Sequence, residues 1–192
     1  CQGQLATPQC GHTWHCDIQG KFYILGVSRQ AHVWHAQDDR SSHVIVRSYR
    51  HKDQTQDAVI QMVRTINTKE YLPDHVEVRI IHTDADSVLL DKELMSTLSG
   101  MEVIVTLCPV ETHELNGKAE HQVFRITWYS KAMLNTAMLD LSFWPCTHEQ
   151  ATLIMNQLPS RNGPSKSRCA VCHNKKFNAN YLHPVGCVTV IR

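Results

Sequence analysis

Hydrophobic and polar residues alternate over the first fifty positions in a pattern that predicts three short strands. Residues 12–18, 31–37 and 43–49 are rich in β-branched and aromatic residues, and polar segments separate them. A polar D-D-R-S run at positions 38–41 follows the second strand. We interpret this run as a turn rather than as a pair of functional acids, because Asp and Ser favour turns between strands.

The pattern changes to a helical period after Asp53, which is a candidate N-cap. Apolar residues recur every three or four positions up to residue 66, as on one face of a helix. Residues 76–81 return to the β-branched content of a buried strand. Residues 87–99 then predict a helix that Gly100 ends, and residues 102–107 predict a fifth strand.

The last part of the chain is mostly helical. A loop closed by Asn116-Gly117 leads into a long predicted helix over residues 117–139. Thr147 opens a capping box for a further helix, which Pro159 ends. Strands that alternate with helices indicate an α/β domain.

Three carboxylates lie in or at the ends of these predicted elements. Asp17 lies in the first strand, Asp84 follows the fourth, and Glu120 lies early in the long helix, with 35 residues between the last two. Each has an ordinary explanation alone, since an Asp can cap a helix and a Glu can answer the helix dipole. Together they form a sensible magnesium site, because Mg²⁺ takes hard oxygen ligands from a few carboxylates, water and phosphate.

Short motifs occur in a set order along the chain. They are H-x-D-x-x-G at 15–20, D-D-x-S at 38–41, H-T-D at 82–84, N-G-x-A-E at 116–120, F-W at 143–144, N-x-L-P-S at 156–160 and the closing LHPVGCVTV at 182–190. In this order the motifs resemble the catalytic core of copia-type LTR-retrotransposon integrases, within the retroviral integrase superfamily. The resemblance covers nearly the whole chain.

The resemblance implies an RNase H-like fold, with a five-stranded mixed sheet and helices on both faces. It implies that Asp17, Asp84 and Glu120 hold two Mg²⁺ (or Mn²⁺) ions, which would activate a 3′-hydroxyl for in-line attack on a phosphodiester. The chain would then be a polynucleotidyl transferase that joins the 3′ ends of element DNA to target DNA. Expected partners are both DNAs and further copies of the chain, and the expected location is intracellular, first in a cytoplasmic particle and then in the nucleus.

The sequence also departs from the family pattern near the acids. Residues 85–88 are A-D-S-V, where the family usually has a glycine, an acid and an aromatic residue after the second aspartate. His121 replaces an arginine and Lys21 a proline, while the three acids are intact. We interpret Asp86 as the N-cap of the following helix and Asp84 as the metal ligand. The alternative hypothesis is a catalytically degenerate or domesticated integrase-derived scaffold that binds DNA or partner proteins.

Charge is unevenly distributed. Six of the 19 Lys and Arg residues lie in residues 161–192, which hold no acid, so residues 1–160 carry 13 basic groups against 18 acidic ones, a net charge of −5. Such a core binds a polyanion only where metal ions or a basic extension offset the repulsion. The candidate DNA contacts on the long helix are Asn116, Lys118, Arg125 and Lys131. The alternative is that this charged face of the helix is only solvated.

These features divide the chain into a linker at 1–12, a catalytic core at 13–160 and a basic C-terminal extension at 161–192. The family places a zinc-binding module upstream of the linker. No apolar run is long enough to span a bilayer, and the eight scattered cysteines predict free thiols or metal ligands.

The extension contains a candidate zinc-binding set. Cys169 and Cys172, together with His183 and Cys187, have a spacing that could hold a tetrahedral zinc ion. The closing segment of the family accounts for Cys187 without a metal, so we expect little zinc there.

Overall fold

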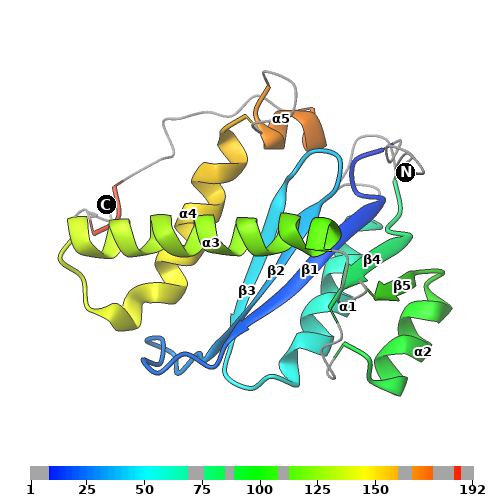
Figure 1. Cartoon of the computed structure of the whole chain (residues 1–192), viewed down its shortest axis with the longest axis horizontal. Helices are drawn as coiled ribbons and strands as arrows, with labels where there is room; N and C mark the ends of the chain where they lie inside the picture. The colour runs from blue at the N-terminus through cyan, green and yellow to red at the C-terminus, as the bar shows by residue number, and fades with distance from the viewer. Residues whose placement is uncertain are drawn as a thin grey trace, which may run out of the picture.

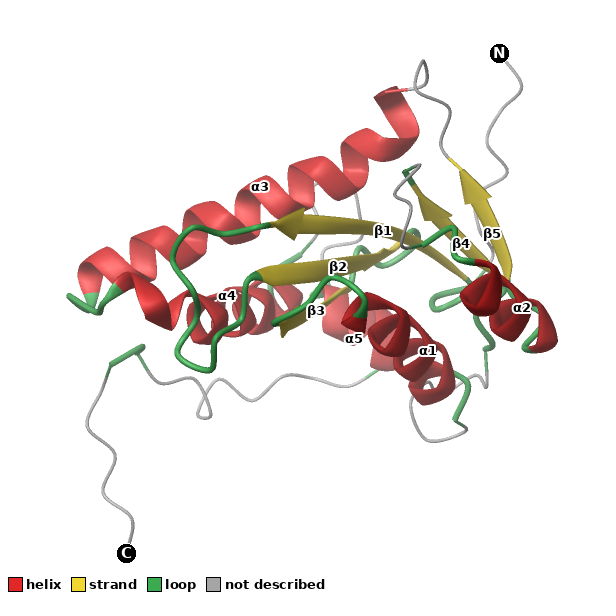
Figure 2. Cartoon of the chain, turned by 90° about the horizontal axis from the view of Figure 1, so that it is seen from below, coloured by secondary structure: helices red, strands yellow, loops and turns green. Residues whose placement is uncertain are grey.

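A five-stranded mixed sheet forms the centre of the protein (Figures 1 and 2). The structure is a computed structural model, and it describes residues 9–68, 76–84, 89–107, 113–159, 166–174 and 184–186, with the side chains of 113–116 and 118 left out. In chain order the elements are β1 (Thr13–Gly20), β2 (His32–Asp38), β3 (Val44–Tyr49), α1 (Gln54–Ile66), β4 (Ile80–Thr83), α2 (Lys92–Gly100), β5 (Ile104–Leu107), α3 (His113–Thr136), the 3₁₀ turn η1 (Leu141–Phe143), α4 (Trp144–Gln157) and α5 (Arg168–His173).

The strand order is β3-β2-β1-β4-β5, and it joins two kinds of pairing. Strands β1, β2 and β3 form an antiparallel meander, as expected where short turns link consecutive strands. Strands β4 and β5 add in parallel to the other side of β1, each after a helical crossover. The predicted α/β class and mixed five-stranded sheet are therefore confirmed.

Helices cover both faces of the sheet, and each face has its own apolar core. On one face, Trp14 of β1 and Trp34 of β2 pack with α1 and α2. Side chains alternate along a strand, so the neighbouring residues of β1 and β2 point to the other face, which α3 covers. On the opposite face, Val33 and Val46 pack with Ile126 of α3 and with residues of α4. Figure 2 shows the long helix α3 lying along this second face.

The predicted starts of three helices and one strand were wrong, each because of a local hydrogen bond, a proline or tertiary packing. Strand β4 begins at Ile80 rather than Val76, since the Val78 N–H donates to the side chain of Asn67 instead of pairing with a strand. Helix α2 begins at Lys92, capped by Asp91, whose carboxylate accepts from the N–H groups of Glu93 and Leu94. Asp86, our predicted cap, lies outside the described residues.

Helix α4 begins at Trp144, three residues before the predicted capping box. Pro145 occupies its first turn, a position where the fixed φ of proline favours a helix. Thr147, the predicted cap, is buried inside the helix, and its hydroxyl lies 2.6 Å from the Ser130 hydroxyl of α3. Thr147 therefore joins α4 to α3 instead of opening α4.

Helix α3 begins at His113, so Asn116-Gly117 lie inside it and do not close a loop as predicted. Asn-Gly favours turns only weakly against tertiary packing, and Ala119 and Val123 are buried one and two turns later. The remaining starts are as expected: Asp53 caps α1, with its carboxylate accepting from the Gln54 N–H at 3.0 Å.

Part of the predicted C-terminal extension packs on the core. Helix α5 contacts α4, and Cys172 belongs to the same buried cluster as Trp14. Arg168 is only 2% exposed and donates a hydrogen bond to Gln122 of α3. At least one cation of the basic extension is therefore a core residue and not part of a solvated tail.

Candidate functional site

The pairing of β1 with β4 places two of the predicted acids next to each other. The two strands run parallel, and Cys16 pairs with Thr83 at the end of the ladder. Asp17 and Asp84 are the next residues on either strand. In this register they occupy neighbouring positions across the two strands.

Both aspartates belong to the face of the sheet that α3 covers. His15 and His82 are paired across the strands, and their rings stack with centroids 4.9 Å apart. Since side chains alternate along a strand, Asp17 and Asp84, two residues further on, share this face. Gln19 shares it too, and its side-chain oxygen accepts a hydrogen bond of 3.2 Å from Thr127 of α3.

The third acid comes from α3. Glu120 lies seven residues before Thr127, which is two helical turns, so both residues are on the same side of the helix. Glu120 is exposed, while Ala119 beside it is buried. The side of α3 that meets β1 at Thr127 therefore carries Glu120 nearer to its N-terminus. We call Asp17, Asp84 and Glu120 the acid group.

The members of the acid group are accessible carboxylates. Asp17 and Asp84 are half-buried, and Glu120 is exposed. One Asp17 oxygen accepts from the Ile18 N–H at 2.7 Å, and the Thr83 hydroxyl lies 3.5 Å from an Asp84 oxygen. The ligand atoms of the three acids do not all lie within 4.8 Å of one another. In the described part of the chain, another group of side chains meets that distance, so the acids do not form a closed cluster.

Two histidines beside the acids have partners of their own. The Nε2 of His15 lies 2.9 Å from a carboxylate oxygen of Asp39, and the Nδ1 of His82 lies 2.5 Å from the Thr106 hydroxyl. These contacts agree with a structural role for both imidazoles. They hold the stacked pair in place and thereby fix the β1–β4 register from which the acids project.

The D-D-R-S run forms the predicted turn. Asp38 ends β2 and is fully buried, and it accepts hydrogen bonds from the Gly11 N–H and from both the N–H and the hydroxyl of Ser41. Burial raises the pKa of Asp38, while these hydrogen bonds oppose the rise. Asp38 is thus the bonded centre of a turn.

The predicted DNA contacts are only partly described. Lys131 is exposed on α3 and Arg125 is half-buried, whereas the side chains of Asn116 and Lys118 lie outside the described residues. Arg125 is close enough to Arg168 to act on it electrostatically, and burial together with the charge of Arg125 lowers the pKa of Arg168 to about 10. Positive charge from α3 and α5 is therefore concentrated beside this helix.

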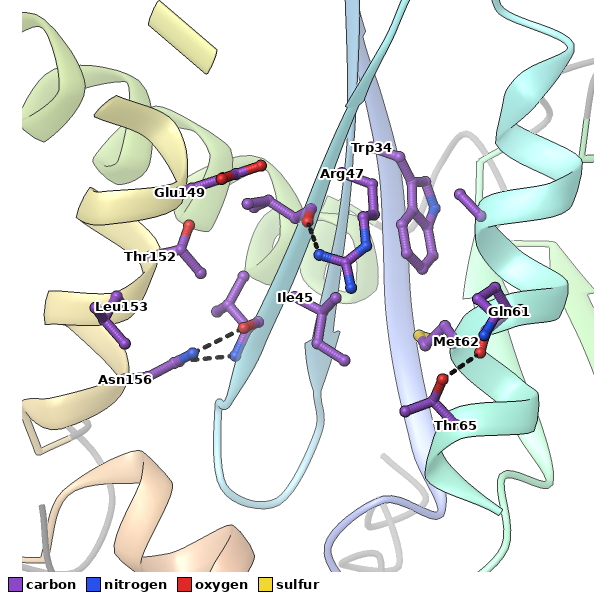
Figure 3. Close-up of a pocket in the computed structure, with 13 residues that line it drawn as sticks. Trp34, Ile45, Arg47, Gln61, Met62, Thr65, Glu149, Thr152, Leu153 and Asn156 are labelled. Carbon is purple, nitrogen blue, oxygen red and sulfur yellow. Dashed lines mark hydrogen bonds between the residues drawn. The ribbon is translucent and has the colours of Figure 1, made fainter. Parts of the chain in front are cut away.

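A cavity of about 320 Å³ lies elsewhere, between α1, β3 and α4, and contains none of the acid group (Figure 3). Asn156 is on its α4 side, and its amide pairs with both backbone groups of Val44, donating to the carbonyl at 2.8 Å and accepting from the N–H at 2.9 Å. Asn156, which sequence reasoning noted only as part of a motif, thus secures the edge strand β3.

The one closed cluster of metal-ligand side chains in the described residues escaped the sequence analysis. It consists of His43, Cys172 and His173, and we call it the His/Cys cluster. Of the predicted zinc set, Cys172 belongs to it and Cys169 lies one turn earlier in α5, while His183 and Cys187 lie outside the described residues. The adjacent Cys-His pair was a visible signal, but nothing in the sequence singled out His43.

No protein-family model matches the sequence. The structure is similar to the HTLV-2 integrase catalytic core domain in complex with magnesium, with a TM-score of 0.64 and 19% identity over 86% of this chain and 99% of that one. It is similar to the BIV integrase catalytic core domain, with a TM-score of 0.60 and 13% identity over 84% of this chain and 93% of that one. A chain of a simian T-cell lymphotropic virus intasome gives a TM-score of 0.65 at 13% identity, over 96% of this chain and 59% of that chain.

These similarities define the fold as the RNase H-like fold of integrase catalytic cores. Among the helices that the structure describes, none has the length and apolar content to cross a membrane.

Proposed function

We propose that this chain is an integrase catalytic core, a metal-dependent polynucleotidyl transferase of the kind found in retroelements. The observation that carries the proposal is the β1–β4 register, which sets Asp17 and Asp84 side by side on the face that α3 covers with Glu120. The RNase H-like fold supports it, since the similar HTLV-2 core was solved with magnesium. The copia-type resemblance of the motifs places the chain, as a proposal, among LTR-retrotransposon integrases.

The residues present fit two divalent metal ions. Carboxylate oxygens are the hard ligands that Mg²⁺ and Mn²⁺ prefer, and half-buried or exposed acids leave room for water and phosphate oxygens to complete the coordination. Asp17, Asp84 and Glu120 would hold the ions. When bound, the ions would supply activation of the attacking oxygen and stabilisation of the leaving oxygen at a phosphodiester.

The chain itself contributes position and charge. Asp17 stands on β1 and Asp84 directly follows the last paired residue of β4, so the backbone hydrogen bonds of this ladder hold the two acids near each other. Lys131 and Arg125 on α3 would contact phosphates and orient the DNA without reading its sequence. The net charge of −5 on residues 1–160 would repel DNA, so binding at the acid group requires the cations.

The intasome and the dimeric and trimeric forms among the similar structures support assembly into oligomers on element and target DNA. A nuclear site of action, after a cytoplasmic particle, follows from the proposed reaction and is part of the proposal.

The test combines metal binding with strand transfer. Titration calorimetry should find two Mn²⁺ sites in the wild type that are lost in Asp17→Asn and Glu120→Gln, and both variants should lose Mn²⁺-dependent joining of a duplex oligonucleotide to a plasmid. Glu149→Gln, which removes an exposed acid from α4, serves as the control and should retain both properties. DNA binding without two-site Mn²⁺ binding or strand transfer in the wild type would overturn the proposal in favour of a DNA-binding scaffold.

A further inference from the structure

The His/Cys cluster brings together side chains from two distant parts of the chain. His43 follows the turn between β2 and β3, and Cys172 and His173 end helix α5. The His43 and His173 rings meet edge to face, with centroids 5.0 Å apart. Figure 1 shows α5 beside this hairpin turn. The three ligand atoms lie within 4.8 Å of one another.

Two of the three cluster residues are buried, and one buried nitrogen of the cluster lacks a hydrogen-bond partner among the described residues. His43 is 7% exposed and Cys172 is 3% exposed. The Nδ1 of His43 is buried and has no hydrogen-bond partner among the described residues. A buried polar nitrogen without a partner costs stability, so a ligand that accepts its lone pair would remove that cost.

The chemical state of these groups suits a soft metal ion. Burial, with the charges of His173 and Arg168, lowers the pKa of His43 to about 3, so its imidazole is neutral and offers a lone pair. Burial raises the pKa of the Cys172 thiol, and only a bound cation would stabilise its thiolate there. Neutral imidazole and thiolate are the ligands that zinc selects in structural sites.

A further thiol lies close to the His/Cys cluster, outside the three residues whose ligand atoms lie within 4.8 Å of one another. Cys10 precedes β1, and its thiol donates a hydrogen bond of 3.6 Å to the carbonyl of Val171. Val171 is the residue before Cys172 in the chain. Its thiol is close enough to contribute to the raised pKa of Cys172. Two thiolates would neutralise Zn²⁺, which matters because the buried cation Arg168 also acts on this cluster.

We propose that His43, Cys172 and His173, with Cys10 as the fourth ligand, bind one Zn²⁺ ion that fastens α5 to the core. Zinc–ligand bonds of about 2.0–2.3 Å place tetrahedral ligand atoms about 3.3–3.8 Å apart. The ligand atoms of His43, Cys172 and His173 lie within 4.8 Å of one another, so they need to approach by at most about 1.5 Å, and the thiol of Cys10 would turn toward them. The ion would join three segments: the approach to β1, the β2–β3 turn and the C-terminal helix. This site shares only Cys172 with the set predicted from the Cys-x-x-Cys spacing.

The experiment measures zinc in the whole chain of residues 1–192 after purification with added zinc and dialysis. Elemental analysis should find about one equivalent in the wild type. Cys172→Ser and His43→Gln should bind zinc at least about tenfold more weakly in competition with a chromophoric chelator. Cys169→Ser is the matched control. Cys169 lies one turn away in the same helix and, like Cys10, contributes to the raised pKa of Cys172, but it is not part of the His/Cys cluster, so this variant should keep wild-type affinity.

Further measurements keep the result interpretable if a buried variant fails to fold. His173→Gln alters a half-buried ligand and should also lose zinc. Cobalt substituted into the wild type should show a thiolate-to-metal charge-transfer band that weakens in Cys10→Ser. Absence of zinc from the wild type, a cobalt complex without thiolate absorption, or equal zinc loss in Cys169→Ser would each overturn the proposal. Unchanged affinity in Cys10→Ser would overturn the assignment of the fourth ligand.

Discussion

The acid group and the His/Cys cluster are two candidate metal regions of one sheet, and they differ in almost every physical respect. The acid group offers hard oxygen ligands that are half-buried or exposed and do not form a closed cluster. The His/Cys cluster offers softer nitrogen and sulfur ligands that are mostly buried and already close together. One region suits an ion that must share its coordination with water and phosphate, and the other suits an ion enclosed by protein.

The two regions also lie in different parts of the fold, and each location suits its kind of metal site. The two aspartates that would meet DNA lie on β1 and directly after β4, and they are only half-buried, so solvent can reach them. Imidazole and thiol ligands lie where a terminal helix packs on a hairpin, and there they can add stability without blocking a substrate. If both assignments hold, a change in one region should leave the other largely unaffected, because coupling falls off between separate sites.

The largest effect should follow loss of a ligand in the acid group. Asp84→Asn should reduce Mn²⁺-dependent strand transfer below detection with little change in melting temperature, because it removes a metal ligand and no buried contact. Asp91→Ala is the control, since it removes the carboxylate that caps α2: it should cost about 1 kcal/mol of stability and leave the reaction intact. Activity in Asp84→Asn, measured by strand-transfer assay, would show that Asp84 is not a ligand.

Removal of zinc should act on stability alone. A chelator that binds zinc much more strongly than Mg²⁺, such as 1,10-phenanthroline, should lower the unfolding free energy by about 2.7 kcal/mol where free zinc stood at about 100 times its Kd. For a chain of this size, the melting temperature should fall by about 5–10 °C in a thermal scan. Added zinc should reverse the shift, whereas recovery with Mg²⁺ alone would contradict a soft-ligand site.

A smaller loss of stability should follow a change in the β2–β3 hairpin, and it should leave the acid group unaffected. Asn156→Ala removes both hydrogen bonds to Val44 and leaves buried backbone groups of the edge strand unpaired, so it should cost about 2 kcal/mol. Urea unfolding of this variant should be compared with that of Gln157→Ala, whose side-chain oxygen has no partner among the described residues. Equal stability of the two variants would mean that the Asn156 pairing contributes nothing, and neither change should affect Mn²⁺ binding.

Local signals predicted most elements, and their failures have specific causes. The turn after β2 and the Asp53 cap follow from residues that are adjacent in sequence. The starts of β4 and α4 were misjudged because Asn67 and Pro145 act through contacts that no periodic pattern reveals. The start of α2 was placed too early because Asp91 accepts hydrogen bonds from N–H groups of the first helical turn, which a helical period alone does not reveal.

The sequence by itself determined the class of the fold, and it predicted the three acids as metal ligands. Alternation along β1 puts His15, Asp17 and Gln19 on one face, and helical spacing puts Glu120 on the same side of α3 as Thr127, whatever the rest of the chain does. Only the tertiary structure decided that β4 pairs in register with β1, which brings Asp84 beside Asp17. It likewise brought His43 to Cys172 and His173 across about 130 residues, because such contacts depend on the packing of whole elements and not on local preference.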